Sequence, residues 1–148
     1  MSQALPVLRA HGARYYLLDP LRDKAEILYA ESKFEEAREQ NLEVLALAIE
    51  LNHEEIVLQS HVLAAKIDFA LGDQDGGRRQ LEHWLAEFQD SAEQAALHYE
   101  LWKMGHDALH SQTAVDLYRH LYRTKPYFEY KLRLEELLPG QTKKAITK

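Results

Sequence analysis

The sequence predicts an all-α solenoid of three helical hairpins and a C-terminal capping helix. The chain repeats itself with a period of about 40 residues: Ala25 returns as Ala65, Tyr29 as Phe69, Glu35 as Asp75 and Arg38 as Arg78. A weaker third copy follows 37 residues later, where Gly77 becomes Ala114 and His83 becomes His120. Apolar residues follow helical spacing, and no long stretch alternates with period two. Such self-similarity indicates one supersecondary unit stacked on copies of itself.

The first hairpin is expected to begin at Asp19-Pro20, because an acidic N-cap followed by proline is typical of a helix start. Its first helix runs to about Glu31, and its second helix spans residues 34–51. We expect Leu5-Pro6 to break any helix that precedes the first hairpin. Residues 1–18 are therefore predicted to be a lead-in segment, either the remnant of a preceding element or a cap on the first repeat.

The second hairpin covers residues 52–88. Asn52 is predicted to cap its first helix, with Glu55 at the spacing of a capping box. Glycine is favoured just after a helix, so Gly72 marks the end of this helix. The second helix of the hairpin follows and runs to about Phe88.

The third hairpin opens at Asp90-Ser91, where Glu93 again lies at capping-box spacing. Gly105 is expected to end its first helix, and a longer connection leads to Ser111. The second helix ends at Lys125-Pro126, since the residue before proline disfavours helical geometry.

A last amphipathic helix, residues 127–138, is predicted to have a basic outer face. It would cover the apolar side of the last hairpin with Tyr127, Leu132, Leu134, Leu137 and Leu138. The basic tail, residues 139–148, is expected to be disordered.

Two local patterns resemble the tetratricopeptide (TPR) family. Phe34-Glu35-Glu36-Ala37 is similar to the opening of that family's second helix, and the spacing of Ala114, Tyr118, Leu121 and Pro126 is similar to its second-helix motif. The resemblance covers about residues 19–138 and implies a right-handed αα-superhelix that binds proteins. Because the period is about 40 residues rather than 34, two-helix repeats of the HEAT class are the alternative.

Small residues recur where the two helices of a hairpin are expected to cross. A side chain larger than a methyl group at such a position would push the helices apart. We therefore predict packing roles, and no direct functional role, for Ala25, Ala37, Ala65, Gly77 and Ala114.

Composition excludes several classes of chemistry. The 148 residues include no cysteine, which rules out disulfides, thiolate metal sites and a thiol nucleophile. No run approaches the roughly 20 apolar residues of a membrane span, and no secretory signal pattern opens the chain, so we expect a cytoplasmic protein. The net charge of −6 is spread unevenly, with acids concentrated in residues 31–55 and bases in residues 119–148.

The sequence favours a protein that is not an enzyme and needs no cofactor. One alternative is a metal-dependent hydrolase site at His106, Asp107 and His110, because histidines four residues apart can share one helix face. The other alternative is nucleic-acid binding through the basic C-terminal helix, where bases alternate with aromatic residues. The sequence contains no glycine-rich phosphate-binding loop.

The favoured interpretation is an interaction scaffold for a protein or peptide partner, with no membrane or nucleic-acid partner and with self-association left open. The first helix of each hairpin would line the concave face, because its small residues face the packed side. The predicted lining is Arg22, Glu26 and Tyr29 from the first hairpin, Val62, Lys66 and Phe69 from the second, and Tyr99, Lys103 and His106 from the third. Aromatic side chains with a few charges are typical of a peptide groove.

Overall fold

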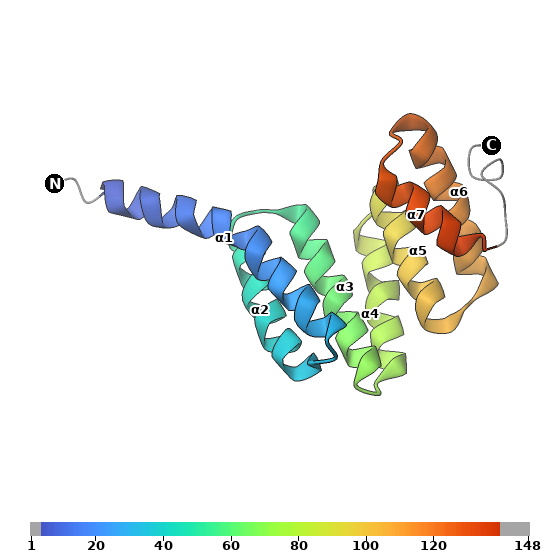
Figure 1. Cartoon of the computed structure of the whole chain (residues 1–148), viewed down its shortest axis with the longest axis horizontal. Coiled ribbons are helices and arrows are strands. Elements are labelled where there is room, and N and C mark those ends of the chain that lie inside the picture. The colour runs from blue at the N-terminus through green and yellow to red at the C-terminus, as the bar shows by residue number, and fades with distance from the viewer. Residues whose placement is uncertain (1–3, 140–148) are drawn as a thin grey trace. The chain divides into compact units, whose positions relative to one another are not determined.

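The structure, a computed structural model, describes residues 4–139, with side chains from residue 14 onward. This part of the chain contains seven α-helices and no strand, which confirms the all-α prediction for it (Figure 1). The chain divides into two compact units: unit 1, residues 1–77, and unit 2, residues 78–148. The basic tail predicted to be disordered begins at Pro139, and its remainder lies outside the described residues.

Unit 1 contains α1 (Ala4–Ala30), α2 (Phe34–Glu50), α3 (Glu54–Ala70) and the start of α4 (Gln74–Glu87). Two apolar clusters hold its helices together. One surrounds Leu18, Val44 and Ile56, and the other surrounds Ala25, Ala37, Leu63 and Ile67. Two polar contacts join α2 to α3: the Arg38 Nη2 atom lies 2.7 Å from the Asp68 Oδ1 atom, and the Asn41 amide donates to the Ser60 carbonyl.

The first helix differs from the prediction. We expected a helix start at Pro20 and a break at Leu5-Pro6, but α1 runs without interruption from Ala4, with Pro20 in its interior. The N-terminal stretch of α1 extends beyond α2 and α3 (Figure 1). Proline is tolerated in a first turn, where its missing N–H has no helical partner, so Pro6 does not stop the helix. Pro20 is exposed, so water can reach the carbonyl that its missing N–H leaves free.

The three turns of unit 1 are built alike. In each, one residue takes the left-handed conformation, with φ of 62° at Ser32, 56° at Asn52 and 108° at Gly72. The next backbone N–H reaches five residues back, as from Lys33 to the Leu28 carbonyl at 2.9 Å. The predicted N-cap at Asn52 is therefore wrong, since Asn52 belongs to the end of α2. His53 is the N-cap, and its Nδ1 atom accepts the Ile56 N–H at 3.3 Å.

Unit 2 contains the remainder of α4, together with α5 (Ser91–Gly105), α6 (Ala108–Thr124) and α7 (Phe128–Leu137). The predicted capping box is present at the start of α5. The Glu93 carboxylate accepts the Asp90 backbone N–H, and the Asp90 carboxylate accepts the Ala92 backbone N–H. One apolar cluster forms the core: Ala95, Tyr99, Ala114, Val115, Tyr118, Leu134 and Leu137. Thus α7 covers the last hairpin as predicted, although Tyr127 and Leu132 of the expected covering set are exposed.

The connection between α5 and α6 is shorter than predicted. We expected a loop that reaches Ser111, but α5 ends at Gly105 and α6 begins at Ala108. His106 takes the left-handed conformation with φ of 54°, and the Asp107 carboxylate accepts the Leu109 N–H at 2.7 Å. An aspartate N-cap satisfies one of the unpaired amides of the first turn. His110 therefore lies on a helix, not in a loop.

The predicted small packing residues are buried at helix contacts. Ala25, Ala37, Ala65 and Ala114 have no exposed surface. A Cβ atom added at Gly77 would lie 2.7 Å from the Ala65 carbonyl oxygen and 3.0 Å from the Phe69 Cβ atom. The start of α4 thus touches the backbone of α3, which leaves no room for a side chain.

Candidate functional site

A face shared by α1 and α3 brings together residues that are far apart in the sequence. The Arg22 Nη1 atom donates to the Gln59 Oε1 atom at 3.0 Å, and the Lys66 ammonium lies 5.0 Å from the centroid of the Tyr29 ring. These contacts join the first helices of two successive hairpins. Three of the predicted binding residues, Arg22, Tyr29 and Lys66, therefore occupy one face of unit 1.

We call this surface the α1/α3 face and define it by six residues: Arg22, Glu26, Tyr29, Val62, Lys66 and Phe69. Five of them are half-buried, and Glu26 is exposed. The Arg22 guanidinium also lies 3.4 Å from the Asp19 carboxylate and 3.2 Å from that of Asp23. The Tyr29 ring packs against Phe34 at 5.6 Å between centroids. The face thus offers partly covered aromatic rings beside charges of both signs.

The three binding residues predicted from the third hairpin lie in unit 2 and have a different setting. Tyr99 is only 7 % exposed, and its hydroxyl donates to the Glu136 carboxylate on α7. The Tyr99 ring also contacts the Lys103 ammonium and the Arg133 guanidinium, at 5.4 Å and 4.7 Å from its centroid. Tyr99 therefore packs in the core of unit 2 and has little surface to offer a ligand. Lys103 and His106 are exposed.

Arg133 is the centre of a half-buried polar cluster between α5, α6 and α7. Its guanidinium donates to the Tyr118 hydroxyl and lies 3.0 Å from the Glu129 carboxylate. Burial raises the pKa of Tyr118 to about 12, although the neighbouring Arg133 charge acts in the opposite direction. Burial likewise raises the pKa of Tyr99, and its hydrogen bond to Glu136 adds to the increase. The Tyr99 hydroxyl, the Tyr118 hydroxyl and the Arg133 guanidinium each contact a polar neighbour within unit 2, which indicates a structural role for the cluster.

A pair of histidines, His98 on α5 and His110 on α6, was not predicted as a pair. Their Nδ1 atoms are 2.9 Å apart and their ring centroids are 5.1 Å apart. Burial, followed by the charge of His110, lowers the pKa of His98 below its usual value. Sequence reasoning missed His98 because it placed His110 in a loop. With α6 assigned from Ala108, both histidines lie on neighbouring helices.

The predicted metal-binding triad does not assemble. His106 lies at the end of α5 with its ring 5.7 Å from that of Trp102, Asp107 caps α6, and His110 faces His98. Among the residues whose side chains the structure describes, no group of three or more histidine, cysteine, aspartate or glutamate residues is arranged to hold a metal ion. A hydrolase built on these three side chains therefore has no support in the geometry.

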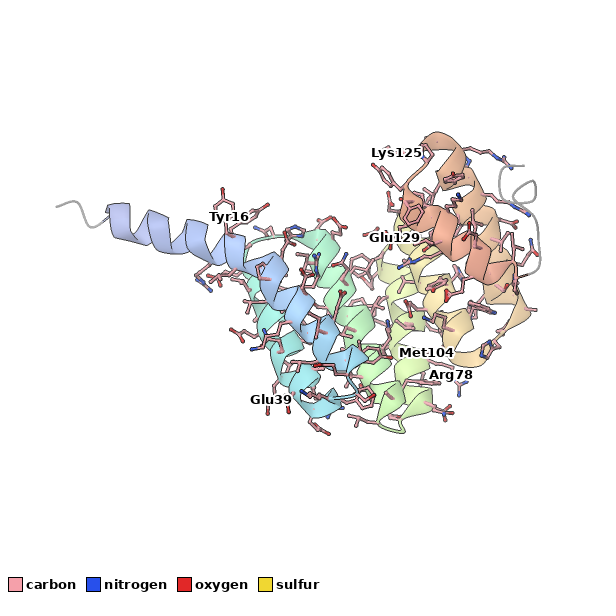
Figure 2. All side chains as sticks on the ribbon, in the orientation of Figure 1. Tyr16, Glu39, Arg78, Met104, Lys125 and Glu129 are labelled. Carbon is pink, nitrogen blue, oxygen red and sulfur yellow. The ribbon has the colours of Figure 1, made fainter. Side chains whose placement is uncertain are left out.

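The prediction of a basic outer face on α7 is wrong. The three exposed charged residues of this helix are Glu129, Glu135 and Glu136, and Glu129 is labelled on α7 in Figure 2. Its two bases, Lys131 and Arg133, are half-buried, and Arg133 is held in the polar cluster. Phosphate groups are bound by exposed cations, so the exposed charges of this helix do not support the alternative of nucleic-acid binding.

Comparisons with protein-family models, with curated proteins and with solved structures found no match to this chain. None of the helices in the described residues combines the length and the apolar character that crossing a membrane requires.

Proposed function

We propose that this chain is a non-catalytic interaction module that binds a peptide segment of another protein on the α1/α3 face. The observation that supports this proposal is the contact between Lys66 and the Tyr29 ring. This contact joins α1 and α3, the first helices of two hairpins, through an aromatic ring. Partly covered aromatic side chains are the usual anchors of a binding surface, and charged side chains beside them add specificity.

The proposal includes the TPR-like arrangement that the repeats resemble. In a right-handed superhelix of hairpins, the first helices line the inner surface, and the α1/α3 face would be part of it. The small residues buried between helices of unit 1 agree with such stacking. Binding by this face needs no catalytic group and no cofactor.

Glu26 gives the face a preference for the charge of its ligand. It is exposed in the C-terminal part of α1, and no ion pair to it is present among residues 14–139, whereas Arg22 is paired with acids of its own helix. A peptide with a basic side chain opposite Glu26 would gain a charge pair, whereas a carboxylate placed there would be repelled. We therefore propose a peptide that is neutral or basic at this position.

The test is a selection of peptides from a random display library on the full chain, followed by measurement of Kd by fluorescence anisotropy. The double variant Tyr29→Leu and Lys66→Ala removes the aromatic face and the cation but keeps apolar bulk where Tyr29 packs. We expect it to bind the selected peptide at least about tenfold more weakly, which corresponds to about 1.4 kcal/mol. Glu26→Lys should weaken binding of a basic peptide and spare a neutral one.

The matched control is the double variant Tyr16→Leu and Lys24→Ala. It changes the same two residue types, both on α1, at exposed positions outside the α1/α3 face. Tyr16, which is 81 % exposed, is labelled on α1 in Figure 2. The control should bind like the unmodified chain. Equal binding by all variants, with unchanged far-ultraviolet circular dichroism, would place the ligand elsewhere and refute the proposal.

A further inference from the structure

The His98–His110 pair is half-buried at the contact between α5 and α6 and takes no part in the α1/α3 face. We infer that these two histidines form a chelating site for a late first-row divalent cation such as Ni²⁺, Cu²⁺ or Zn²⁺, with water as the remaining ligands. This site differs from the predicted triad, because it uses His98 and leaves His106 and Asp107 in their structural positions.

The separation of the two nitrogens carries the inference. A metal ion binds imidazole nitrogen at about 2.0–2.1 Å, so two nitrogens at a right angle around it are about 2.9 Å apart, and two at a tetrahedral angle are about 3.3 Å apart. The observed distance between the His98 and His110 Nδ1 atoms is 2.9 Å. Rotation of the two rings, with a shift of a few tenths of an ångström, directs both nitrogens at one ion.

The protons of the pair are compatible with this exchange. At 2.9 Å one Nδ1 atom must donate an N–H and the other must accept it, since two protonated nitrogens would repel. For both to bind a metal, the donor ring moves its proton to Nε2, and neutral histidine loses no proton overall. A metal binds the neutral form of each ring.

The ligand set determines which ions would bind. Among residues 14–139 no carboxylate joins the two imidazoles in a metal-binding group. Two imidazoles suit Cu²⁺, Ni²⁺ and Zn²⁺, and offer little to Mg²⁺ or Ca²⁺, which prefer several oxygen ligands. A bound ion would join α5 to α6 by a second type of link, beside the apolar cluster of unit 2. Because the folded chain alone presents both histidines together, binding would stabilise it.

The test is a titration of the full chain with Ni²⁺ and with Zn²⁺ by isothermal titration calorimetry at pH 7.5, with Mg²⁺ as the comparison ion. We expect one Ni²⁺ or Zn²⁺ per chain and no saturable binding of Mg²⁺. His98→Gln and His110→Gln should each weaken binding at least about tenfold, because each removes one of the two imidazole ligands. His106→Gln and His120→Gln, at exposed histidines of the same unit, should leave the affinity unchanged.

A second measurement identifies the ligands directly. With one equivalent of Cu²⁺, electron paramagnetic resonance should show hyperfine splitting from two equivalent nitrogens, reduced to one or none in His98→Gln. Circular dichroism establishes that each variant is folded. No saturable binding of either metal would mean that the pair is only a hydrogen bond, and undiminished binding by the folded His98→Gln variant would mean that another site holds the ion; either result overturns the inference. Neither result bears on peptide binding by the α1/α3 face.

Discussion

Single residues define the turns of unit 1 more regularly than their identities suggest. Ser32, Asn52 and Gly72 follow one another at intervals of 20 residues, and all three take the left-handed conformation. Glycine is the residue most often used at such positions, and asparagine is tolerated. The similarity of residues along the chain shows only the period of about 40 residues. The shorter period of the turns is hidden because serine, asparagine and glycine are different residue types. The turn recurs with half that period.

Close approach of helix backbones makes Gly77 a sensitive position. A Cβ atom there would lie 2.7 Å from the Ala65 carbonyl oxygen, a backbone atom that cannot move without shifting α3. We expect Gly77→Leu to lower the free energy of unfolding by about 1–3 kcal/mol or more through overpacking. Ala114→Leu should do the same in unit 2, where Ala114 is fully buried. Urea denaturation followed by circular dichroism measures both effects.

Gly105→Ala is the control for the glycine substitution. An added Cβ atom at Gly105 would meet only the end of the Arg78 side chain, at an ordinary contact distance of 3.5 Å. Alanine is the better helix former, so this change should be neutral or slightly stabilising. If Gly77→Leu and Gly105→Ala have equal midpoints, the packing role assigned to Gly77 is wrong.

At the scale of whole elements, most helix ends could be predicted closely, but the starts of α1 and α6 could not. Hydrophobic periodicity and capping residues indicate helix interiors, and they place both ends of α2 and α7, and the end of α4, within one residue of their observed positions. Pro20 was misleading, because proline is common at a helix start but also survives inside an exposed helix. The left-handed His106 has no sequence signal, so the short α5–α6 connection was missed.

The candidate site could be predicted only where the repeat fixed the helix register. The 40-residue period relates Tyr29 to Phe69, and the structure places both on the helices that form the α1/α3 face. For Tyr99 the same reasoning missed a decisive contact, because Arg133 and Glu136 of α7 cover its ring and bind its hydroxyl. Pairing across 37 positions of sequence has no local signature, and neither does the His98–His110 contact.

The packing of α7 on α6 makes unit 2 sensitive to alkaline pH. The folded state raises the pKa of Tyr118 to about 12 from an ordinary value of 10, so the unfolded chain releases this proton first. The stabilisation is complete below pH 10 and is lost as the pH rises from 10 to 12. The slope approaches about 1.4 kcal/mol per pH unit for one group. Denaturant titrations at several pH values, followed by tryptophan fluorescence, measure the slope.

Tyr118→Phe should reduce this alkaline slope. It also removes the acceptor of the Arg133 hydrogen bond, so we expect a loss of about 1–3 kcal/mol at neutral pH. Tyr16→Phe, at an exposed side chain of unit 1, is the control and should change neither quantity. A Tyr118→Phe variant with the full alkaline slope would show that another group controls the titration of unit 2.

At the scale of the molecule, the chain has two compact units, and each has apolar clusters of its own. Parts of a folded chain can open at different free energies, and separate apolar clusters favour such independent opening. The division also separates the two proposed activities, because the α1/α3 face lies in unit 1 and the histidine pair lies in unit 2. Each can be tested without damage to the core of the other.

The separate cores predict that one unit can be destabilised without the other. Ile56 is fully buried in unit 1 and Leu134 in unit 2, and replacing either with alanine should cost about 2–5 kcal/mol. Both tryptophans, Trp84 and Trp102, belong to unit 2, so fluorescence reports this unit alone while circular dichroism reports all helices. Ile56→Ala should lower the midpoint of the dichroism transition and leave the fluorescence midpoint in place, whereas Leu134→Ala should lower the fluorescence midpoint. A common shift of both signals in both variants would show that the chain unfolds as one cooperative unit, because only coupling between the cores carries the loss from one to the other.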